Sequence, residues 1–387
     1  ISTDLLIKPD TLNTLRYLGN IQTKNFEIGK IIEDQEKIGK LSMNANVDGT
    51  SQPGNISAQL SGNIESLDLF DYTYKNVNLK GLLTEKKFDG SFEVSDPNIQ
   101  INFSGSIDFS AEIPDFDFIA DVSRIRPYYL NIAKTDPSYF ASFMLKANFT
   151  GKNIDNLDGQ IELINSYFQK RDEQIQIYDF IINAHNNDSL SYIEVNSDFM
   201  DAELNGNYQF SKLVNSFKNV VGNYLPALTD GQIRTPDTLD RNNFEFKIML
   251  NKIEPVVRFF VPEYIIGDST FIAGNYNPSN ADIKVTGHLP MVNMKGKKFE
   301  NLNIIASTNP ENTEIFFNSG KLILNNEFEV TNIFMDAKII QDSARFNFTW
   351  DNEQTPIYRG NLNLMARIDK NSVTKNTALG VSLLPSD

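Results

Sequence analysis

Alternation of apolar and polar residues dominates the chain, and its period of two is typical of β-strands. In the segment 40–49, "KLSMNANVDG", apolar residues share one face while asparagine and serine take most of the other. In 98–109, "NIQINFSGSIDF", isoleucine and phenylalanine alternate with polar residues in the same way. Strands with one apolar and one polar face indicate an antiparallel sheet that is covered on one side only.

The same pattern recurs along most of the chain, and we predict that its apolar residues line one interior face. The alternation does not distinguish a core filled by side chains from the wall of a groove, because both place apolar residues inward. The residues predicted to line this face are Leu41, Met43, Val47, Ile56, Leu60, Ile99, Ile101, Phe103, Ile107, Phe109, Phe116, Phe118, Phe143, Leu145, Phe149, Ile161, Leu163, Leu204, Tyr208, Phe244, Phe246, Ile248, Ile283, Val285, Leu289, Phe346, Phe348, Trp350, Leu362 and Leu364.

Glycines interrupt these strand patterns in phase with the apolar face, at Gly105, Gly206, Gly287 and Gly360. A glycine inside a strand marks a bulge or a bend. We infer that these glycines let the sheet curve sharply without collisions between side chains. Their spacing is irregular, which argues against a solenoid of fixed repeat length.

Helical spacing is limited to short segments. The four predicted helices lie near 10–18, 124–133, 211–225 and 255–261. The third is amphipathic, and we interpret it as a helix packed on the end of the sheet; the alternative is a helix that meets a membrane surface or a partner.

Residues 226–242 have no periodicity and contain Pro226, Gly231 and Pro236, so we predict a loop or linker there. It separates a first β segment, 1–225, from a second, 243–387.

Together these patterns predict a mainly β fold. About two dozen strands, spaced ~4.8 Å apart, would form a sheet too long to stay open and flat. We predict a long, curled, antiparallel-rich sheet, a gutter or taco with an apolar interior, accompanied by a few short amphipathic helices.

Composition excludes several kinds of chemistry. The 387 residues include no cysteine, which excludes thiolate metal sites and disulfides. They include two histidines, which leave few imidazole groups for metal binding or catalysis. The net charge of −15 argues against a nucleic-acid partner. A start of an EF-hand pattern at Asn44, Asn46 and Asp48 lacks the acidic twelfth residue and is explained by the polar face of a strand. We predict no enzyme activity, no cofactor and no metal.

No apolar stretch reaches the ~18 residues of a membrane helix, and no signal peptide pattern is present. We interpret the chain as a soluble segment of something longer.

Several phrases resemble the TamB branch of the AsmA-like envelope proteins, in the form found in Bacteroidota. The most specific is "FDGSFEVSDPNIQINFSGSIDF" at 88–109, and others are "DLLIKPDTLNTL" at 4–15, "VPEYIIGDSTFIAGNYNP" at 261–278 and "ARFNFTWDNEQTPIYRGNLNL" at 344–364. The resemblance covers nearly the whole chain but only an internal part of such a protein.

The resemblance implies a β-groove in the periplasm that holds phospholipid or fatty acid chains between the inner and outer membranes. It also implies an Omp85-family outer-membrane partner, and an inner-membrane anchor outside this chain. Two alternatives stay open. One is a scaffold or chaperone that assists outer-membrane β-barrel assembly through an exposed sheet edge. The other is an enzyme or carbohydrate-binding β-solenoid, which would need carboxylates or aromatic residues on the outer face.

Overall fold

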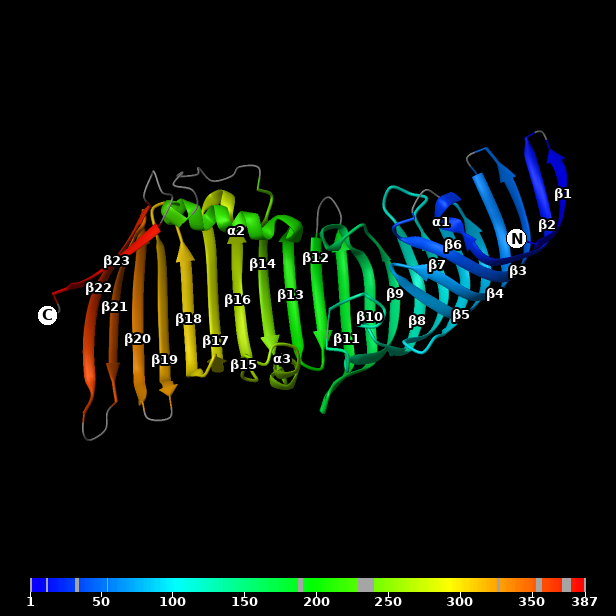
Figure 1. Ribbon diagram of the computed structural model, residues 1–387. Coiled ribbons are helices and arrows are strands. Elements are labelled where there is room, and N and C mark those ends of the chain that lie inside the picture. The colour runs from blue at the N-terminus through cyan, green and yellow to red at the C-terminus, as the bar shows by residue number, and fades with distance from the viewer. Residues whose placement is uncertain are drawn as a thin grey trace. The chain divides into compact units, whose positions relative to one another are not determined.

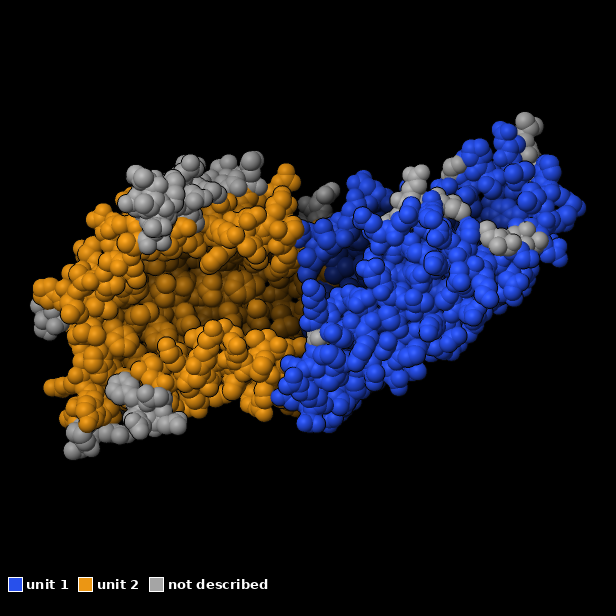
Figure 2. All heavy atoms as spheres, in the orientation of Figure 1, with its two compact units in different colours: residues 1–183 blue, residues 184–387 orange. Residues whose placement is uncertain are grey.

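The computed structural model describes residues 2–11, 13–31, 35–53, 55–134, 136–186, 191–228, 240–325, 328–352, 357–370 and 377–385. The chain forms two compact units, unit 1 (1–183) and unit 2 (184–387), which Figure 2 colours separately. Strands predominate in both units, and the described residues form three short α-helices. The predicted mainly β, antiparallel fold with few helices is confirmed.

Unit 1 is an antiparallel sheet in which each strand from β1 to β10 pairs with the next one along the chain (Figure 1). Its helical elements are α1 (Ile28–Ile31) and the 3-10 turn η1 (Ile154–Asn156). The strands are β1 (Ser2–Thr11), β2 (Thr14–Glu27), β3 (Ile38–Gln52), β4 (Asn55–Leu69), β5 (Tyr72–Thr84), β6 (Lys87–Ser95), β7 (Ile99–Asp108), β8 (Asp115–Ile125), β9 (Phe140–Thr150), β10 (Asp158–Lys170) and β11 (Glu173–Asn186), whose last residues belong to unit 2.

Unit 2 is also an antiparallel sheet. Its strand order follows the chain from β12 to β23, except that β14 pairs directly with β16 and the short β15 pairs with β17. The strands are β12 (Ser191–Ser197), β13 (Met200–Asn207), β14 (Asn243–Leu250), β15 (Tyr264–Ile266), β16 (Thr270–Asn277), β17 (Asp282–Met294), β18 (Lys297–Thr308), β19 (Thr313–Asn325), β20 (Phe328–Ile340), β21 (Ser343–Asp351), β22 (Arg359–Lys370) and β23 (Thr377–Leu384). The helical elements are α2 (Phe210–Tyr224), α3 (Glu254–Phe260), and the 3-10 turns η2 (Pro226–Leu228) and η3 (Pro278–Asn280).

The two faces of each sheet differ in chemistry, because side chains alternate between faces along every strand. Hydrogen bonds between asparagine side chains connect neighbouring strands on the outer face. The Asn63 side-chain amide donates to Asn78 at 2.9 Å in unit 1, and that of Asn303 donates to Asn318 at 2.9 Å in unit 2. The opposite, inner face is apolar in both units.

Three glycines form a row on the inner face of unit 1. Gly81 lies opposite Gly90, and Gly90 lies opposite Gly105, so one glycine row crosses β5, β6 and β7. A Cβ on Gly90 would lie 2.4 Å from the Lys80 carbonyl oxygen. The backbones approach too closely for any side chain, which agrees with the inferred role in curvature. Gly287 differs, because its nearest neighbour is the Leu289 side chain at 3.3 Å.

Two of the predicted helices are confirmed, since α2 matches 211–225 and α3 matches 255–261. The helix predicted near 10–18 is wrong, because β1 and β2 form a hairpin there. The helical spacing of Leu15 and Leu18 is misleading, since both side chains are exposed and residues three apart on a strand point to opposite faces.

The helix predicted near 124–133 is also wrong. Strand β8 continues to Ile125, and a single turn follows in which the Ile132 N–H donates to the Pro127 carbonyl at 3.0 Å. Asn131 ends this turn with a φ of 58°.

The predicted linker 226–242 does not coincide with the boundary between the units, which lies at 183/184 within β11. Of this segment, residues 229–239 lie outside the described residues. The elements on either side of them, η2 and β14, both belong to unit 2.

A buried polar cluster fixes the turn between β6 and β7. Asp96 is 1% exposed and accepts hydrogen bonds from the Tyr72 hydroxyl at 2.5 Å and the Asn98 N–H at 2.8 Å. Burial, together with the hydrogen bond to Asp96, raises the pKa of Tyr72 to about 12.

We expect the Tyr72→Phe variant to lower the free energy of unfolding by about 1–3 kcal/mol at neutral pH, because Asp96 loses a donor inside the fold. The folded-state pKa of Tyr72 lies above the ordinary value of 10, so its contribution is complete below pH 10 and is lost as pH rises towards 12. Urea unfolding of both proteins at several pH values should therefore show a difference that shrinks above pH 10. A difference that is constant with pH would contradict this assignment.

Candidate functional site: the apolar inner faces

The inner face of unit 1 is filled by its own aromatic side chains between β6 and β9. Phe103 stacks on Phe92 with ring centroids 4.6 Å apart and lies 5.1 Å from Phe118. Phe116 stacks on Phe149 at 4.6 Å. Phe103 is 5% exposed and is covered by its neighbours, while Phe92, Phe116, Phe118 and Phe149 are half-buried.

Cross-strand pairing brings most of the predicted residues of unit 1 onto this one face. Three of them lie at the margin of this face. Ile99 lies at the end of β7 opposite Ile125, and the side chains of Ile56 and Phe109 are exposed. Leu41 is buried beside a register shift between β3 and β4. The others are Met43, Val47, Leu60, Ile101, Phe103, Ile107, Phe116, Phe118, Phe143, Leu145, Phe149, Ile161 and Leu163.

The inner face of unit 2 forms a continuous apolar floor. One row of directly paired residues runs across six strands, and its first five members alternate between larger side chains and alanine. The row consists of Val285, Ala306, Ile315, Ala337, Phe346 and Leu364. Most of these side chains are only half-buried. Figure 2 shows unit 2 hollowed on the face that it presents.

The predicted residues of unit 2 all lie on or beside this face. Tyr208 follows β13 and is buried, with its ring 5.0 Å from that of Phe210 in α2. The remaining predicted residues in this unit are Leu204, Phe244, Phe246, Ile248, Ile283, Val285, Leu289, Phe346, Phe348, Trp350, Leu362 and Leu364. Their role as the lining of a lipid groove stays a prediction.

Helix α2 forms a wall along one side of this floor, across the strand ends (Figure 1). The Ser216 hydroxyl is 2.6 Å from the hydroxyl of Tyr276, whose ring belongs to the inner face and stacks on Phe244. The Tyr224 hydroxyl donates to the Asn309 carbonyl at 2.7 Å. The opposite side of the helix exposes Val214 (66%) and Phe217 (59%). The interpretation of 211–225 as a helix packed on the sheet end agrees with these contacts.

Asp342 connects the C-terminal end of α2 to the sheet. Its carboxylate accepts the Ala227 N–H at 2.7 Å, and its own N–H donates to the Tyr224 carbonyl at 2.9 Å. Asp342 has a positive φ of 64° in the turn between β20 and β21.

We expect the Asp342→Gly variant to loosen the C-terminal end of α2 by about 1–2 kcal/mol, because the Ala227 N–H loses its acceptor. The Asp342→Asn variant is the matched control, since asparagine keeps the acceptor oxygen and tolerates a positive φ. Amide hydrogen exchange of residues 220–228 measures the effect. Equal exchange rates in the two variants would contradict this role for Asp342.

An apolar pocket of about 410 Å³ opens on this floor where α2 ends. Nine of its ten lining residues are apolar, and Asp342 is the tenth. The lining residues are Leu225, Ile339, Asp342, Ala344, Phe346, Leu364, Ala366, Ile368, Leu379 and Val381.

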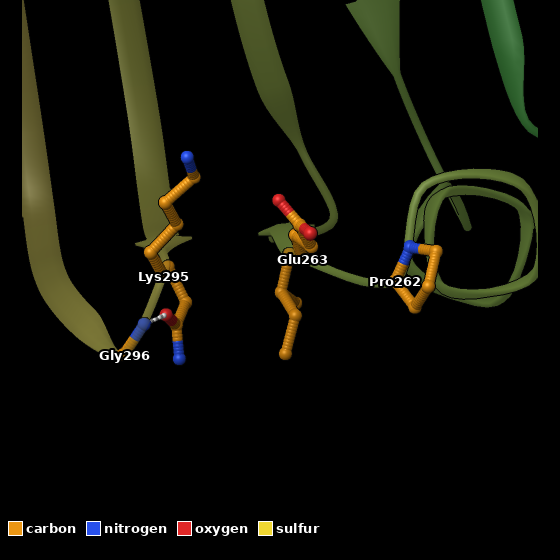
Figure 3. A pocket seen from close by; sticks show the side chains of 6 residues that line it. Pro262, Glu263, Lys295 and Gly296 are labelled. Carbon is orange, nitrogen blue, oxygen red and sulfur yellow. Dashed lines mark hydrogen bonds between the residues drawn. The ribbon is translucent and has the colours of Figure 1, made fainter.

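A second depression, of about 500 Å³, lies at the ends of β15 and β17 and includes two charged residues in a mixed lining. Figure 3 shows Glu263 and Lys295 pointing to the same side of it. The backbone N–H of Lys295 donates to the Glu263 carbonyl at 3.2 Å, and the N–H of Gly296 donates to Asn293 at 3.0 Å. Its charged lining does not suit an apolar ligand.

Within the described ranges, no group of three or more histidine, aspartate or glutamate side chains is arranged to hold a metal ion. Nor does any described helix have the length and apolar character needed to cross a membrane.

Sequence reasoning missed part of both faces. Phe88 and Phe92 of β6 and Phe317 of β19 lie on the inner faces, and the alternation in their strands could have revealed them. The pocket could not be found in this way, because it depends on Ala344 lying directly opposite Ala366 in the next strand.

Searches against protein-family models, curated proteins and solved structures found no match to this chain.

Proposed function

We propose that this chain is a lipid-transfer segment, which holds the acyl chains of phospholipids in the apolar groove of unit 2. The observation that carries the proposal is the half-buried apolar row across six strands, walled on one side by α2. Each methylene that leaves water for such a surface contributes ~0.8 kcal/mol. An extended floor lets a chain move along the groove without a covalent step.

The acidic, asparagine-rich exterior supports the same function. A net charge of −15 keeps a long apolar sheet from self-associating, and it leaves head groups in water beside the groove. From the resemblance to TamB-like envelope proteins we further propose that the chain acts in a cell envelope, with phospholipids, the inner membrane and an Omp85-family protein as partners.

The test is lipid binding by the purified chain after incubation with vesicles of phosphatidylethanolamine and phosphatidylglycerol, followed by native mass spectrometry. We expect bound phospholipid in the wild type and less of it in Ile315→Gln, which places an amide in the floor. The matched control is Phe316→Gln, because Phe316 is the next residue on the same strand and is 41% exposed on the outer face. A wild-type protein without lipid would overturn the proposal.

A second candidate function is a scaffold that pairs its free sheet edge with an unfolded strand of an outer-membrane protein. In the described part of the chain, β23 pairs on one side only, with β22. Its residues Leu379 and Leu383 are 67% and 72% exposed. If the chain has this function, a peptide with the sequence pattern of an amphipathic strand should slow amide hydrogen exchange in β23. The effect should occur without lipid.

A further inference from the structure

The pocket below the end of α2 has the shape and chemistry of a binding site for a single ligand. Its floor is a pair of alanines, Ala344 and Ala366, which face each other across β21 and β22. Ile339 and Val381 continue this row on the two flanking strands. Small side chains between larger ones leave the hollow, and Leu225 lines it on the helix side.

The lining offers a ligand few hydrogen-bonding partners, because nine of its ten residues are apolar. Asp342 is its one charged residue, and the Asp342 carboxylate already accepts the Ala227 N–H at 2.7 Å. A polar ligand would lose its hydrogen bonds to water on entry, which is costly. The apolar lining therefore favours a hydrocarbon ligand.

The volume of the pocket corresponds to a single acyl chain. A methylene group occupies roughly the ~30 Å³ that a water molecule takes in the liquid, so 410 Å³ holds on the order of a dozen of them. Asp342 lines the pocket in a turn that is joined to the end of α2 by two hydrogen bonds of 2.7 and 2.9 Å. The pocket is open beside β23, where Leu379 is 67% exposed.

We propose that this pocket binds the methyl end of one acyl chain, with the polar end of the lipid leaving the groove beside β23. The proposal rests on the proposed function and adds a specific binding site to it, which distinguishes acyl chains by their length. Affinity should rise about four-fold for each added methylene while the pocket fills, and should level off once it is full.

The experiment measures dissociation constants of the full chain for saturated fatty acids from octanoic to stearic acid, by native mass spectrometry. We expect affinity to level off near dodecanoic or myristic acid. Ala366→Phe fills the pocket, so it should weaken the binding of myristic acid at least ten-fold and move the plateau to shorter chains. Leu225→Ala enlarges the pocket and should move the plateau to longer chains.

Arg367→Phe is the matched control, because it adds the same ring to the exposed outer face one residue away. Circular dichroism verifies that each variant is folded, and Leu225→Ala tests the pocket even where the added ring disturbs the sheet. Fatty acid binding with the same plateau in wild type, Ala366→Phe and Leu225→Ala would overturn the pocket while leaving the groove intact. A wild-type chain that binds neither fatty acid nor phospholipid would overturn the proposed function as well.

Discussion

The Gly105→Val variant is expected to lose at least about 3 kcal/mol of unfolding free energy, enough to unfold much of unit 1. Gly105 has a φ of 141°, which side-chain-bearing residues rarely adopt. A Cβ at this position would lie 2.2 Å from the Asp117 carbonyl oxygen and 2.4 Å from the Phe118 Cα. Neither atom belongs to a flexible side chain, so the strands themselves would have to separate.

Urea unfolding followed by circular dichroism measures this loss. The matched control is Ser104→Val, because Ser104 is exposed on the outer face of the same strand and valine favours strands. The control should stay within about 0.5 kcal/mol of the wild type. Equal stability of the two variants would show that the glycine row has no part in bending the sheet.

The alternation of the sequence determines which face each residue takes, and for that reason the fold and most of the predicted interior residues could be anticipated. Phe103 and Leu364 are both placed on the inner face by pattern alone, and cross-strand pairing agrees. The prediction of a helix near 10–18 is wrong because it rests on spacing along the sequence alone. Helical spacing of leucines can arise by chance in a strand, and only pairing with β3 decides which side is buried.

The degree of packing could not be anticipated, because it depends on residues far apart in the sequence. Phe103 is covered because Phe92 and Phe118 come from the neighbouring strands with rings at stacking distance. Leu364 is left half-exposed because Ala344 and Ala366 are small and lie side by side near it. No property of the individual strands distinguishes these two environments.

That difference leads to opposite outcomes for one substitution. We expect Phe103→Asp to unfold unit 1, at a cost of at least about 4 kcal/mol, because it removes a buried ring and places a carboxylate among aromatic side chains. We expect Leu364→Asp to cost about 1–2 kcal/mol, since the carboxylate can reach water from the groove. This second variant should stay folded and lose most of its bound phospholipid.

Each variant has an isosteric control on the adjacent outer-face position of its own strand, Asn102→Asp and Asn363→Asp. Urea unfolding and native mass spectrometry after vesicle incubation give stability and lipid content for all four. A folded, lipid-free Phe103→Asp would mean that the stacked rings of unit 1 part to admit acyl chains. A folded Leu364→Asp with full lipid content would mean that lipid binds elsewhere. The expected pair of results would instead separate a structural core in unit 1 from a groove in unit 2, although the same alternation produces both.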